Sequence, residues 1–526
     1  MKNEVLLLLL SFLIVGCQNH DTERTFYISP MGNDANTGLQ AATAWKTLER
    51  VNQTTFEPGD AIRFESGGIW KGNLKPNGSG SPGKPITIGT YGDGPRPVIN
   101  IGKEEGAGIS LNNQSWWEIE GMEITSGEPH QLGLRREGIV ATAEGEAILI
   151  EHIVIRDCYL HDIWGDVGGD KSGVAIYVGQ RLLGVEAEQN CVANDVLIEN
   201  NTIRRVDKIG IAVNGDEQVI IRKNIIENTG GDGIIVLGAH EALVEYNYAD
   251  RTCLRSGDPD LNTGGEDWWP HTAAIWLYAN TRTIMQYNEV YNTGRQPANG
   301  DGFAYDFDFD CQRCILQYNY SANNHGFLLI MNRTNDNIAR YNISQNDQTH
   351  LIQIHGYTED RNLIHNNVFY VDHSTIDLDY YCGMENEKDK NKLGVNFKNN
   401  IFYASGQGRF RTVYSHGSAI DRQFNDSIHT SALTDPPNFW NNCFFGPWLN
   451  GIPNDPQQVL EDPMLIEAGS GGWGLSSLQG YQLKQASPCI DKGIAIDSMG
   501  KYDYFGHPIG ATTPDIGAFE STSKIN

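Results

Sequence analysis

Positive charge and long apolar runs are both scarce in this sequence. Lysine and arginine number 39 against 66 aspartate and glutamate residues, so the net charge is −27 over 526 residues. Nucleic acid and anionic surfaces are bound by clustered basic side chains, so this balance argues against both as partners. Beyond the apolar run Leu6–Val15, no stretch approaches the length that crosses a bilayer, and the rest of the chain is expected to be soluble and exported.

Residues that bind zinc or build helices are equally sparse. The chain has one C-x-x-C, Cys311 and Cys314, and no second pair at zinc spacing. No βαβ pattern surrounds this motif, so a disulfide that closes a turn is favoured over a redox site. The 58 glycines and the many asparagines and threonines, with little helical periodicity, predict numerous short strands and turns.

The N-terminus combines a short apolar run with a cysteine. The run before Gly16-Cys17 has the length of a signal-peptide core. It resembles a bacterial lipoprotein signal, which implies cleavage after residue 16 and a lipid on Cys17. The chain would then be exported and anchored through that lipid alone, in the outer membrane, facing the periplasm or the cell surface. A plain signal peptide that happens to contain a cysteine is the alternative.

An asparagine recurs through most of the chain. Asn201, Asn224 and Asn247 stand 23 residues apart, each after an alternating apolar segment, and the same phase continues at Asn288, Asn319, Asn342, Asn367, Asn400 and Asn442. A period of this length predicts a solenoid in which each coil buries its core against its neighbours. Asparagine tolerates the left-handed turn conformation, and stacked copies can hydrogen-bond along the axis, so a buried ladder is favoured over a ligand site.

A second recurring segment contains the most unusual stretch of the sequence. Gly302–Asp310 alternates aromatic and acidic residues, which predicts a strand with Phe303, Tyr305 and Phe307 inward and Asp306 and Asp308 outward. Gly210, Gly233, Ala274 and Gly326 begin comparable segments. Aligning the small residues predicts an outward stripe of Ala212, Asn214, Ile235, Leu237, Trp276, Tyr278, Ala304, Asp306, Asp308, Leu328, Ile330 and Asn332.

Both ends of the repeat carry a recognisable pattern. The opening segment 27–64 and the closing motifs 487–493 and 514–520 resemble the ends of right-handed parallel β-helix proteins of the pectate-lyase-like superfamily. The resemblance implies an all-β, right-handed parallel β-helix with caps at both ends, in a chain expected to be monomeric. The divisions are a signal peptide (1–16), a tether and N-terminal cap (17–100), the β-helix with groove-lining insertions (101–445) and a C-terminal cap (446–526).

The acidic strand is the strongest candidate for catalysis. Outward carboxylates two residues apart have Cα atoms about 6.6 Å apart, within the range over which glycoside hydrolases place their acid and base. Asp306 and Asp308 are therefore the central candidates. Asp301 and His325 precede Gly302 and Gly326 and are expected side by side, an arrangement similar to that of polygalacturonases. Glu266 and Asp267, in an insertion one coil earlier, are the other candidates.

Aromatic side chains near these carboxylates suit a sugar. Flat rings match the apolar faces of pyranosides, so the candidates for substrate binding are Trp268, Trp269, Trp276 and Tyr278, together with Asn332. The sequence therefore predicts an exported glycoside hydrolase that acts on a polysaccharide or oligosaccharide and requires no cofactor.

Two other readings stay open. Asp301, Asp306, Asp308 and Asp310 supply the oxygen ligands that Ca²⁺ prefers, which would suit a calcium-dependent polysaccharide lyase with Arg295, Arg313 or Arg333 as base. The basic R-x-K motif of polygalacturonases has no clear counterpart, and the stripe holds no lysine. The third reading is a carbohydrate-binding or adhesive lipoprotein without catalysis.

Overall fold

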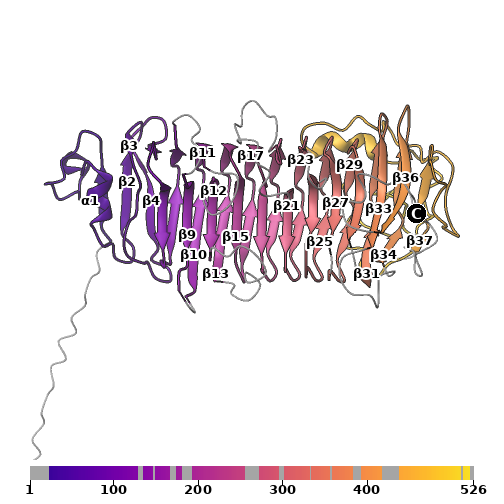
Figure 1. Cartoon of the computed structure of the whole chain (residues 1–526), viewed down its shortest axis with the longest axis horizontal. Coiled ribbons are helices and arrows are strands. Elements are labelled where there is room, and N and C mark those ends of the chain that lie inside the picture. The colour runs from indigo at the N-terminus through magenta and orange to yellow at the C-terminus, as the bar shows by residue number, and fades with distance from the viewer. Residues whose placement is uncertain are drawn as a thin grey trace, which may run out of the picture.

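The chain coils into a long rod of short parallel strands (Figure 1). The structure is a computed structural model, and it describes residues 23–127, 134–145, 148–165, 173–180, 192–254, 272–294, 301–331, 333–355, 358–382, 393–416, 438–510 and 513–521. Each coil contributes one strand to each of three sheets, and the strands in a sheet pair in parallel with the coils before and after. The predicted parallel β-helix is confirmed.

The first sheet has 14 strands and runs the full length of the rod. In spatial order its strands are β1 (Thr25–Ile28), β2 (Ala61–Glu65), β4 (Ile86–Tyr91), β7 (Trp117–Glu120), β10 (Ile150–Arg156), β13 (Ala193–Glu199), β16 (Val219–Arg222), β19 (Leu243–Glu245), β22 (Ile284–Gln286), β25 (Ile315–Gln317), β28 (Ile338–Arg340), β31 (Thr358–His365), β34 (Leu393–Lys398) and β37 (Asn438–Trp440).

The second sheet has 13 strands, each following a strand of the first sheet after a tight turn. They are β3 (Ile69–Lys71), β5 (Val98–Asn100), β8 (Glu123–Thr125), β11 (Tyr159–Ile163), β14 (Thr202–Val206), β17 (Ile225–Thr229), β20 (Tyr248–Asp250), β23 (Glu289–Tyr291), β26 (Tyr320–Ala322), β29 (Ile343–Gln345), β32 (Val368–Val371), β35 (Ile401–Ala404) and β38 (Cys443–Phe445).

The third sheet has 11 strands and contains the acidic segment. They are β6 (Gly106–Asn112), β9 (Arg136–Thr142), β12 (Val174–Gly179), β15 (Ile209–Asn214), β18 (Ile234–Leu237), β21 (Ala273–Tyr278), β24 (Phe303–Phe307), β27 (Gly326–Ile330), β30 (His350–His355), β33 (Thr375–Cys382) and β36 (Arg409–His416). One continuous core of inward Ile, Val, Leu and Phe side chains fills the space between the sheets.

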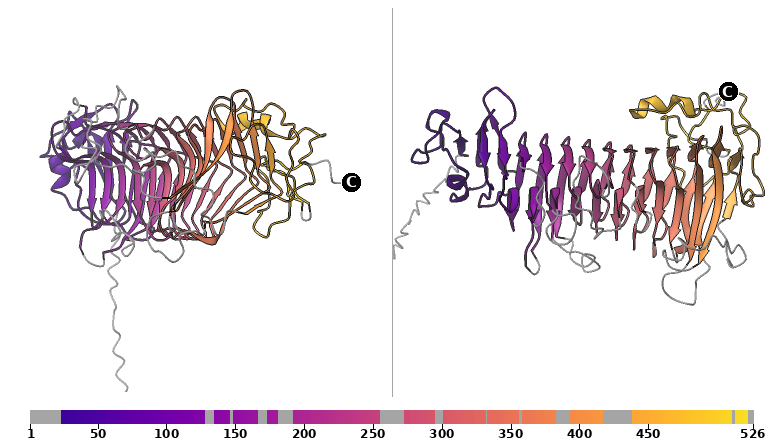
Figure 2. Two further views of the ribbon diagram at one scale, coloured as in Figure 1. Left: turned by 45° about the vertical axis from the view of Figure 1, so that its right-hand side comes forward. Right: turned by 45° about the horizontal axis from the view of Figure 1, so that its top comes forward.

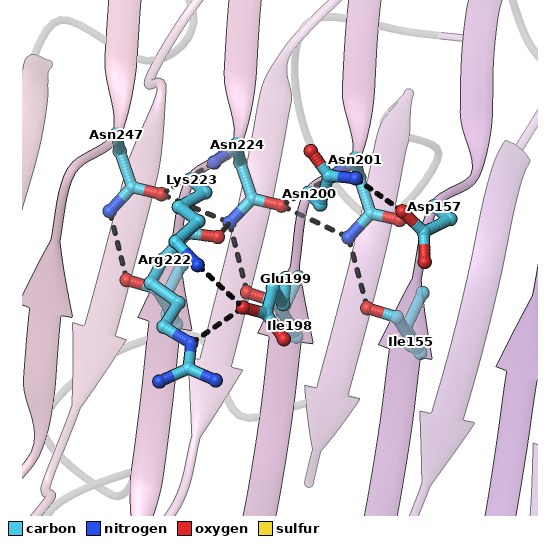
Figure 3. Close-up of polar contacts among 11 residues, drawn as sticks. Ile155, Asp157, Ile198, Glu199, Asn200, Asn201, Arg222, Lys223, Asn224 and Asn247 are labelled. Carbon is cyan, nitrogen blue, oxygen red and sulfur yellow. Dashed lines mark hydrogen bonds and ion pairs between the residues drawn. The ribbon is translucent and has the colours of Figure 1, made fainter.

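The asparagine ladder lies in the turn between the first and second sheets (Figure 3). The backbone N–H and the Nδ2 of Asn201 both donate to Oδ1 of Asn224 at 3.0 Å, and Asn224 donates in the same way to Asn247. The pattern continues to Asn442, which donates to Asp455 beyond the last coil. The ladder predicted from the sequence is confirmed, since each amide satisfies backbone groups that the turn leaves without strand partners.

The left-handed conformation belongs to a different residue from the one expected. It is adopted by the residue before each ladder asparagine, including Lys223 (φ 55°) and Tyr246 (φ 54°), whereas Asn224 and Asn247 have negative φ. The ladder asparagine is therefore selected for its buried amide and not for its backbone.

The N-terminal end of the rod is closed by the predicted strand and short helix. Strand β1 pairs with β2, and helices η1 (Ala41–Thr43) and α1 (Leu48–Asn52) follow it. Thr47 caps α1 by accepting a hydrogen bond from the N–H of Arg50. The ring of Trp45 stacks on Phe26 with centroids 4.9 Å apart and completes the core at this end.

The C-terminal region closes the other end and then folds back. Trp448 packs on Phe410 and Phe444 at the end of the core. The later segment, with helix η3 (Leu475–Tyr481), lies along the second sheet above β23–β29, where the two views agree (Figures 1 and 2). We call residues 463–521 the C-terminal arm. Within the described residues, no helix has both the length and the apolar character needed to cross a membrane.

Candidate functional site

Strand β24 holds the central carboxylate in a fixed position. Tyr305 and Phe307 point into the core as predicted, and the hydroxyl of Tyr305 donates to the carbonyls of Asn288 (3.1 Å) and Tyr320 (3.0 Å). Asp306, between these two anchors, points outward because side chains alternate along a strand. Two buried aromatic side chains therefore fix the direction of the Asp306 carboxyl.

Phe303 does not point into the core as predicted. It forms a separate apolar cluster on the outer face of the third sheet with Ala273 and Leu329, and Trp276 and Met331 pack against it. Ala304 belongs to the core together with Tyr305, so the alternation of period two begins only after Ala304. We call this group the apolar cluster.

The register also differs by one residue from the alignment of small residues. Phe303 pairs with Gly326 and Asp306 pairs with Leu329, so Leu329 faces outward. Ala304, Leu328 and Ile330, expected in the outward stripe, belong to the core. Glycines alone misaligned the coils, because Gly326 pairs with Phe303 and not with Gly302.

Asp306 is almost completely removed from solvent. Its exposure is 6%, and its Oδ1 has no hydrogen-bond partner among the described residues. Burial raises the pKa of Asp306 well above that of an ordinary aspartate, and the negative charges of Asp308, Asp301 and Asp232 raise it further. Asp306 therefore holds a proton more readily than an ordinary aspartate does.

Asp308 and Asp301 lie at the two ends of β24. Asp308 is half-buried directly after the strand, its N–H donates to the carbonyl of Leu277 at 2.9 Å, and its Oδ1 accepts from the N–H of Phe309 at 2.8 Å. Asp301 is 8% exposed and precedes the strand. Both carboxylates are close enough to Asp306 for their negative charges to raise its pKa.

Asp232 belongs to the site and was missed in the sequence. It is fully buried, and its Oδ1 accepts hydrogen bonds from the N–H of Ala273 (3.1 Å) and from Nε1 of Trp276 (3.0 Å). A signal was present, since Asp232 precedes Gly233 as Asp301 precedes Gly302. Its role is to orient Trp276, whose half-buried ring packs beside the apolar cluster.

Asp310 belongs to a different interaction. Nε of Arg333 donates to its Oδ1 at 2.7 Å, and the guanidinium lies 5.1 Å from the ring centroid of Phe309. Arg333, one of the suggested lyase bases, is thereby paired with the preceding coil. In the part of the chain that the structure describes, no three His, Cys, Asp or Glu side chains gather as a metal site.

His325 lies near the carboxylates, although its neighbour differs from the one expected. Since Phe303 pairs with Gly326, His325 faces Gly302 and not Asp301, and a Cβ on Gly302 would lie 3.2 Å from the Cβ of His325. The histidine is 4% exposed, its N–H donates to Oγ1 of Thr293, and its ring centroid is 5.4 Å from that of His350.

The other predicted residues divide into two groups. Tyr278 pairs with Leu237 at the end of β21, half-buried, with its ring centroid 6.4 Å from that of Phe309. The remaining predictions lie outside the described residues and stay predictions: Cys17, Glu266, Asp267, Trp268, Trp269, Arg295 and Asn332.

The C-x-x-C motif does not form the disulfide that was expected. Cys311 and Cys314 are buried free thiols, and they donate to the carbonyls of Leu277 (3.3 Å) and Asn280 (3.4 Å). They act as small core residues that satisfy the turn after β24.

Comparison with known proteins supports the architecture. A sequence family described as "Right handed beta helix region" matches residues 105–306. The chain is a right-handed β-helix protein. The resemblance to this class of folds predicted from the sequence is therefore confirmed.

A curated relative with an assigned activity aligns with almost the whole chain. The lacto-N-biosidase of Bifidobacterium longum subsp. longum is 25% identical over 608 residues, which cover 94% of this chain and 36% of the relative. The chain thus spans about a third of the length of the curated relative that it matches.

Two solved structures share the fold. The GH136 lacto-N-biosidase from Eubacterium ramulus superposes with a TM-score of 0.55 at 22% identity, covering 75% of this chain and 67% of that one. A complex of XylC with xylose gives a TM-score of 0.51 at 10% identity, covering 94% and 98% of the two chains. The chain is therefore distantly similar to a glycoside hydrolase that acts on oligosaccharides.

Proposed function

We propose that this protein is a glycoside hydrolase that cleaves an oligosaccharide on the outer face of the third sheet. The observation that carries the proposal is Asp306, a buried carboxyl with raised pKa next to the less buried Asp308 on the same strand edge. Glycoside hydrolysis requires one protonated and one ionised carboxyl group, and unequal environments supply that difference.

The two carboxyl groups take different roles in this proposal. Asp308, the more exposed, is ionised and acts as base or nucleophile at the anomeric carbon. Asp306 holds the proton that the leaving oxygen takes up, and Asp301, at the other end of β24, is the second candidate for that transfer. The half-buried ring of Trp276 offers a surface for the apolar face of the sugar, and the buried side chains of the apolar cluster support that ring from beneath.

The similarity to lacto-N-biosidases suggests the class of substrate. We infer that the substrate is a neutral oligosaccharide, and lacto-N-biosides are the first compounds to test. Arg333 is paired with Asp310, which favours a neutral sugar over a uronate and a hydrolase over a lyase. A uronate lyase would need unpaired cations near the acids to hold the substrate carboxylate.

The decisive experiment compares three variants on p-nitrophenyl lacto-N-bioside and on a panel of neutral and uronate glycans. We expect Asp308→Asn and Asp306→Asn to lower kcat by about 10²-fold or more, since each removes an acid–base group. Asp310→Asn, on the same turn, is the matched control and is expected to stay within about twofold, because exposed ion pairs contribute little.

Each alternative has its own outcome. Products that absorb in the ultraviolet would establish a lyase in place of a hydrolase. Saccharide binding without turnover in the wild type, lost in Asp306→Asn, would establish a binding protein. Full activity in both Asp306→Asn and Asp308→Asn would place the reaction elsewhere.

We further propose that the protein is exported and anchored by a lipid on Cys17. The lipoprotein-like signal supports this assignment. Replacing the residue, Cys17→Ser, is expected to move the protein from the membrane fraction of the cell to the soluble fraction, as followed by immunoblotting. Retention of Cys17→Ser in the membrane fraction would exclude the lipid as its anchor.

A further inference from the structure

Two rows of outward side chains continue from the candidate site along the third sheet. The first row is Trp276, Asp306, Leu329, Gln353 and Asp379, in register across β21, β24, β27, β30 and β33. The second row, beside it, is Ala273, Phe303, Gly326, His350, Asp377 and Arg411. Apart from Asp306, both rows are apolar up to β27 and polar after it.

The polar ends of the two rows form two hydrogen-bonded pairs, with a histidine next to one of them. Nε2 of Gln353 donates to Oδ2 of Asp379 at 3.0 Å, and Nδ1 of His350 lies 3.6 Å from the same oxygen. Nε and Nη2 of Arg411 donate to the two carboxylate oxygens of Asp377 at 2.8 and 2.7 Å. We call these five residues the distal polar cluster. It combines acids, an amide, an imidazole and a guanidinium on the outer face of one sheet.

An apolar floor joins the distal polar cluster to Asp306. The rings of Phe303 and His350 stack with centroids 5.8 Å apart, across the strand that carries Gly326 between them. A Cβ at Gly326 would lie 2.5 Å from the Phe303 ring, so glycine is required there for the rings to meet. Leu329 fills the adjacent row and completes the floor.

Burying the polar side chains of the distal polar cluster lowers the stability of the fold, which points to a function for the cluster. Gln353 and Asp379 are 5% and 3% exposed, yet they face away from the core of the solenoid. Carboxylates and amides that lose water in this way destabilise a fold unless they are well paired. The side chains of Arg411 and His350 retain 40% and 15% exposure and give the cluster an accessible edge.

We propose that the distal polar cluster is a second sugar-binding subsite, which holds the hydroxyl groups of the same oligosaccharide that is cleaved at Asp306 and Asp308. The inference rests on the proposed function. Three strand spacings separate Asp306 from Asp379, about 14 Å, and one strand spacing is close to the length of one pyranose unit. A saccharide lying along the rod axis would reach from one site to the other.

The chemistry of the cluster fits a neutral sugar. Adjacent hydroxyls donate to carboxylate oxygens and accept from amide and guanidinium N–H groups, and the cluster offers both kinds of partner. The Arg411 charge is matched by Asp377, so a uronate carboxylate would find no uncompensated cation here. Phe303 is fully buried and Leu329 is 5% exposed, so the apolar floor fixes the spacing between the two sites and does not itself contact the sugar.

The test compares the full chain with variants on short and long substrates. The short probe is p-nitrophenyl lacto-N-bioside, and the long probes are a length series of neutral oligosaccharides that contain the unit cleaved fastest. We expect Gln353→Ala and the isosteric Asp379→Asn each to lower kcat/KM for the long members about tenfold, which corresponds to about 1.4 kcal/mol. The kcat on the short probe should stay unchanged.

Gln317→Ala is the matched control, because Gln317 is also a buried glutamine hydrogen-bonded to a neighbouring coil, but on the first sheet. Gln317→Ala should lower neither kcat on the short probe nor kcat/KM on the long probes. Equal losses on short and long probes in both cluster variants, or no loss on the long probes, would overturn the subsite. Asp379→Asn keeps the shape of the side chain and remains informative if Gln353→Ala fails to fold.

Failure of the proposed function gives a different pattern. If the wild type cleaves neither kind of probe, the hydrolase proposal fails, and the subsite is tested by calorimetric binding of the long oligosaccharides. Weaker binding by Gln353→Ala than by Gln317→Ala would still support the subsite. Equal binding by the two variants, or no binding by the wild type, would overturn it.

Discussion

Asp306 is a single side chain whose burial opposes the stability of the fold. Its carboxyl is buried among three other acids, and burial together with their charges raises its pKa. A group with a raised pKa in the folded state favours the protonated form. Its contribution to stability is therefore complete below the pKa of an unfolded aspartate and is lost as pH rises through the folded pKa.

Asp306→Asn should therefore be more stable than the wild type at pH 7 while losing activity. The midpoint of thermal unfolding is expected to rise, by about 1 °C for each kcal/mol gained in a chain of this length, and the difference from the wild type should disappear in acid. Calorimetry between pH 3 and pH 8 measures both effects. A lower midpoint for Asp306→Asn at pH 7 would show that the carboxylate is stabilising.

The same titration predicts a pH dependence of catalysis. If Asp306 must be protonated, kcat falls as pH rises through its folded pKa, which lies above the usual aspartate range. A pH profile of kcat in the wild type measures this loss on the alkaline side. A profile that stays flat there would assign the proton to another group, with Asp301 as the first alternative.

Which residues form the site was only partly predictable from the sequence. The alternation around Tyr305 and Phe307 correctly placed Asp306 outward, because period two is a property of the backbone. Phe303 and Leu329 were misplaced, because Ala304 and Tyr305 both join the core and Phe303 pairs with Gly326, and the alternation of residue types reveals neither fact. Asp232 was missed because its partner, Trp276, is 44 residues away in the chain.

At the scale of the strand and its turn, the asparagine ladder links each coil to the next. Asn224 accepts two hydrogen bonds from Asn201 and donates two to Asn247, all in the buried turn between the first and second sheets. Removing this amide leaves several buried N–H and C=O groups without partners.

Asn224→Ala is expected to lower the free energy of unfolding by about 3 kcal/mol, since each orphaned buried polar group costs about 1–3 kcal/mol. Chemical denaturation measures the loss. Lys223→Gly, at the adjacent left-handed position, is the matched control and should change stability by less than about 1 kcal/mol. At position 223, glycine adopts the left-handed conformation without the strain that lysine has. This gain offsets the larger backbone entropy that glycine loses on folding. Similar losses of unfolding free energy in the two variants would show that the buried amide makes no special contribution to stability.

The ladder was the feature that the sequence predicted best. Its period and its nine members follow from repetition alone. Cys158 occupies the same phase one coil earlier, and its N–H donates to Oδ1 of Asn201. The assignment of the left-handed residue failed, because a repeat shows which positions recur but not which dihedral angle each one adopts. Lys223 and Tyr246 hold that angle without a residue preference that would reveal it.

At the scale of the whole molecule, the C-terminal arm supports one side of the rod. Leu478 and Tyr481 of η3 pack in a cluster with Tyr320 and Ile343 of the second sheet, and the Tyr481 hydroxyl donates to Gln345 at 2.6 Å. The sequence motifs at 487–493 and 514–520 indicated a closing segment. They could not show that it turns back along the coils, because its partners are distant in sequence.

Leu478→Ala should destabilise this side of the rod by about 2–5 kcal/mol through the cavity that it creates. Hydrogen exchange is expected to increase in β26 and β29 beneath the arm and to stay unchanged in β6 and β9, since stability in a solenoid is transmitted between neighbours. An equal increase in all coils would show that the rod unfolds as one unit.

Because the coils are evenly spaced, equivalent positions recur at a constant interval along the outer face of the third sheet. Neighbouring strands on that face are separated by about 4.8 Å. A duplicated coil of 23 residues, the spacing between Asn224 and Asn247, would therefore lengthen the face by one strand spacing. Inserted between β24 and β33, such a duplication would lengthen the preferred glycan by one unit. Diversification of substrate length in this architecture therefore needs no new active site, only a change in the number of turns.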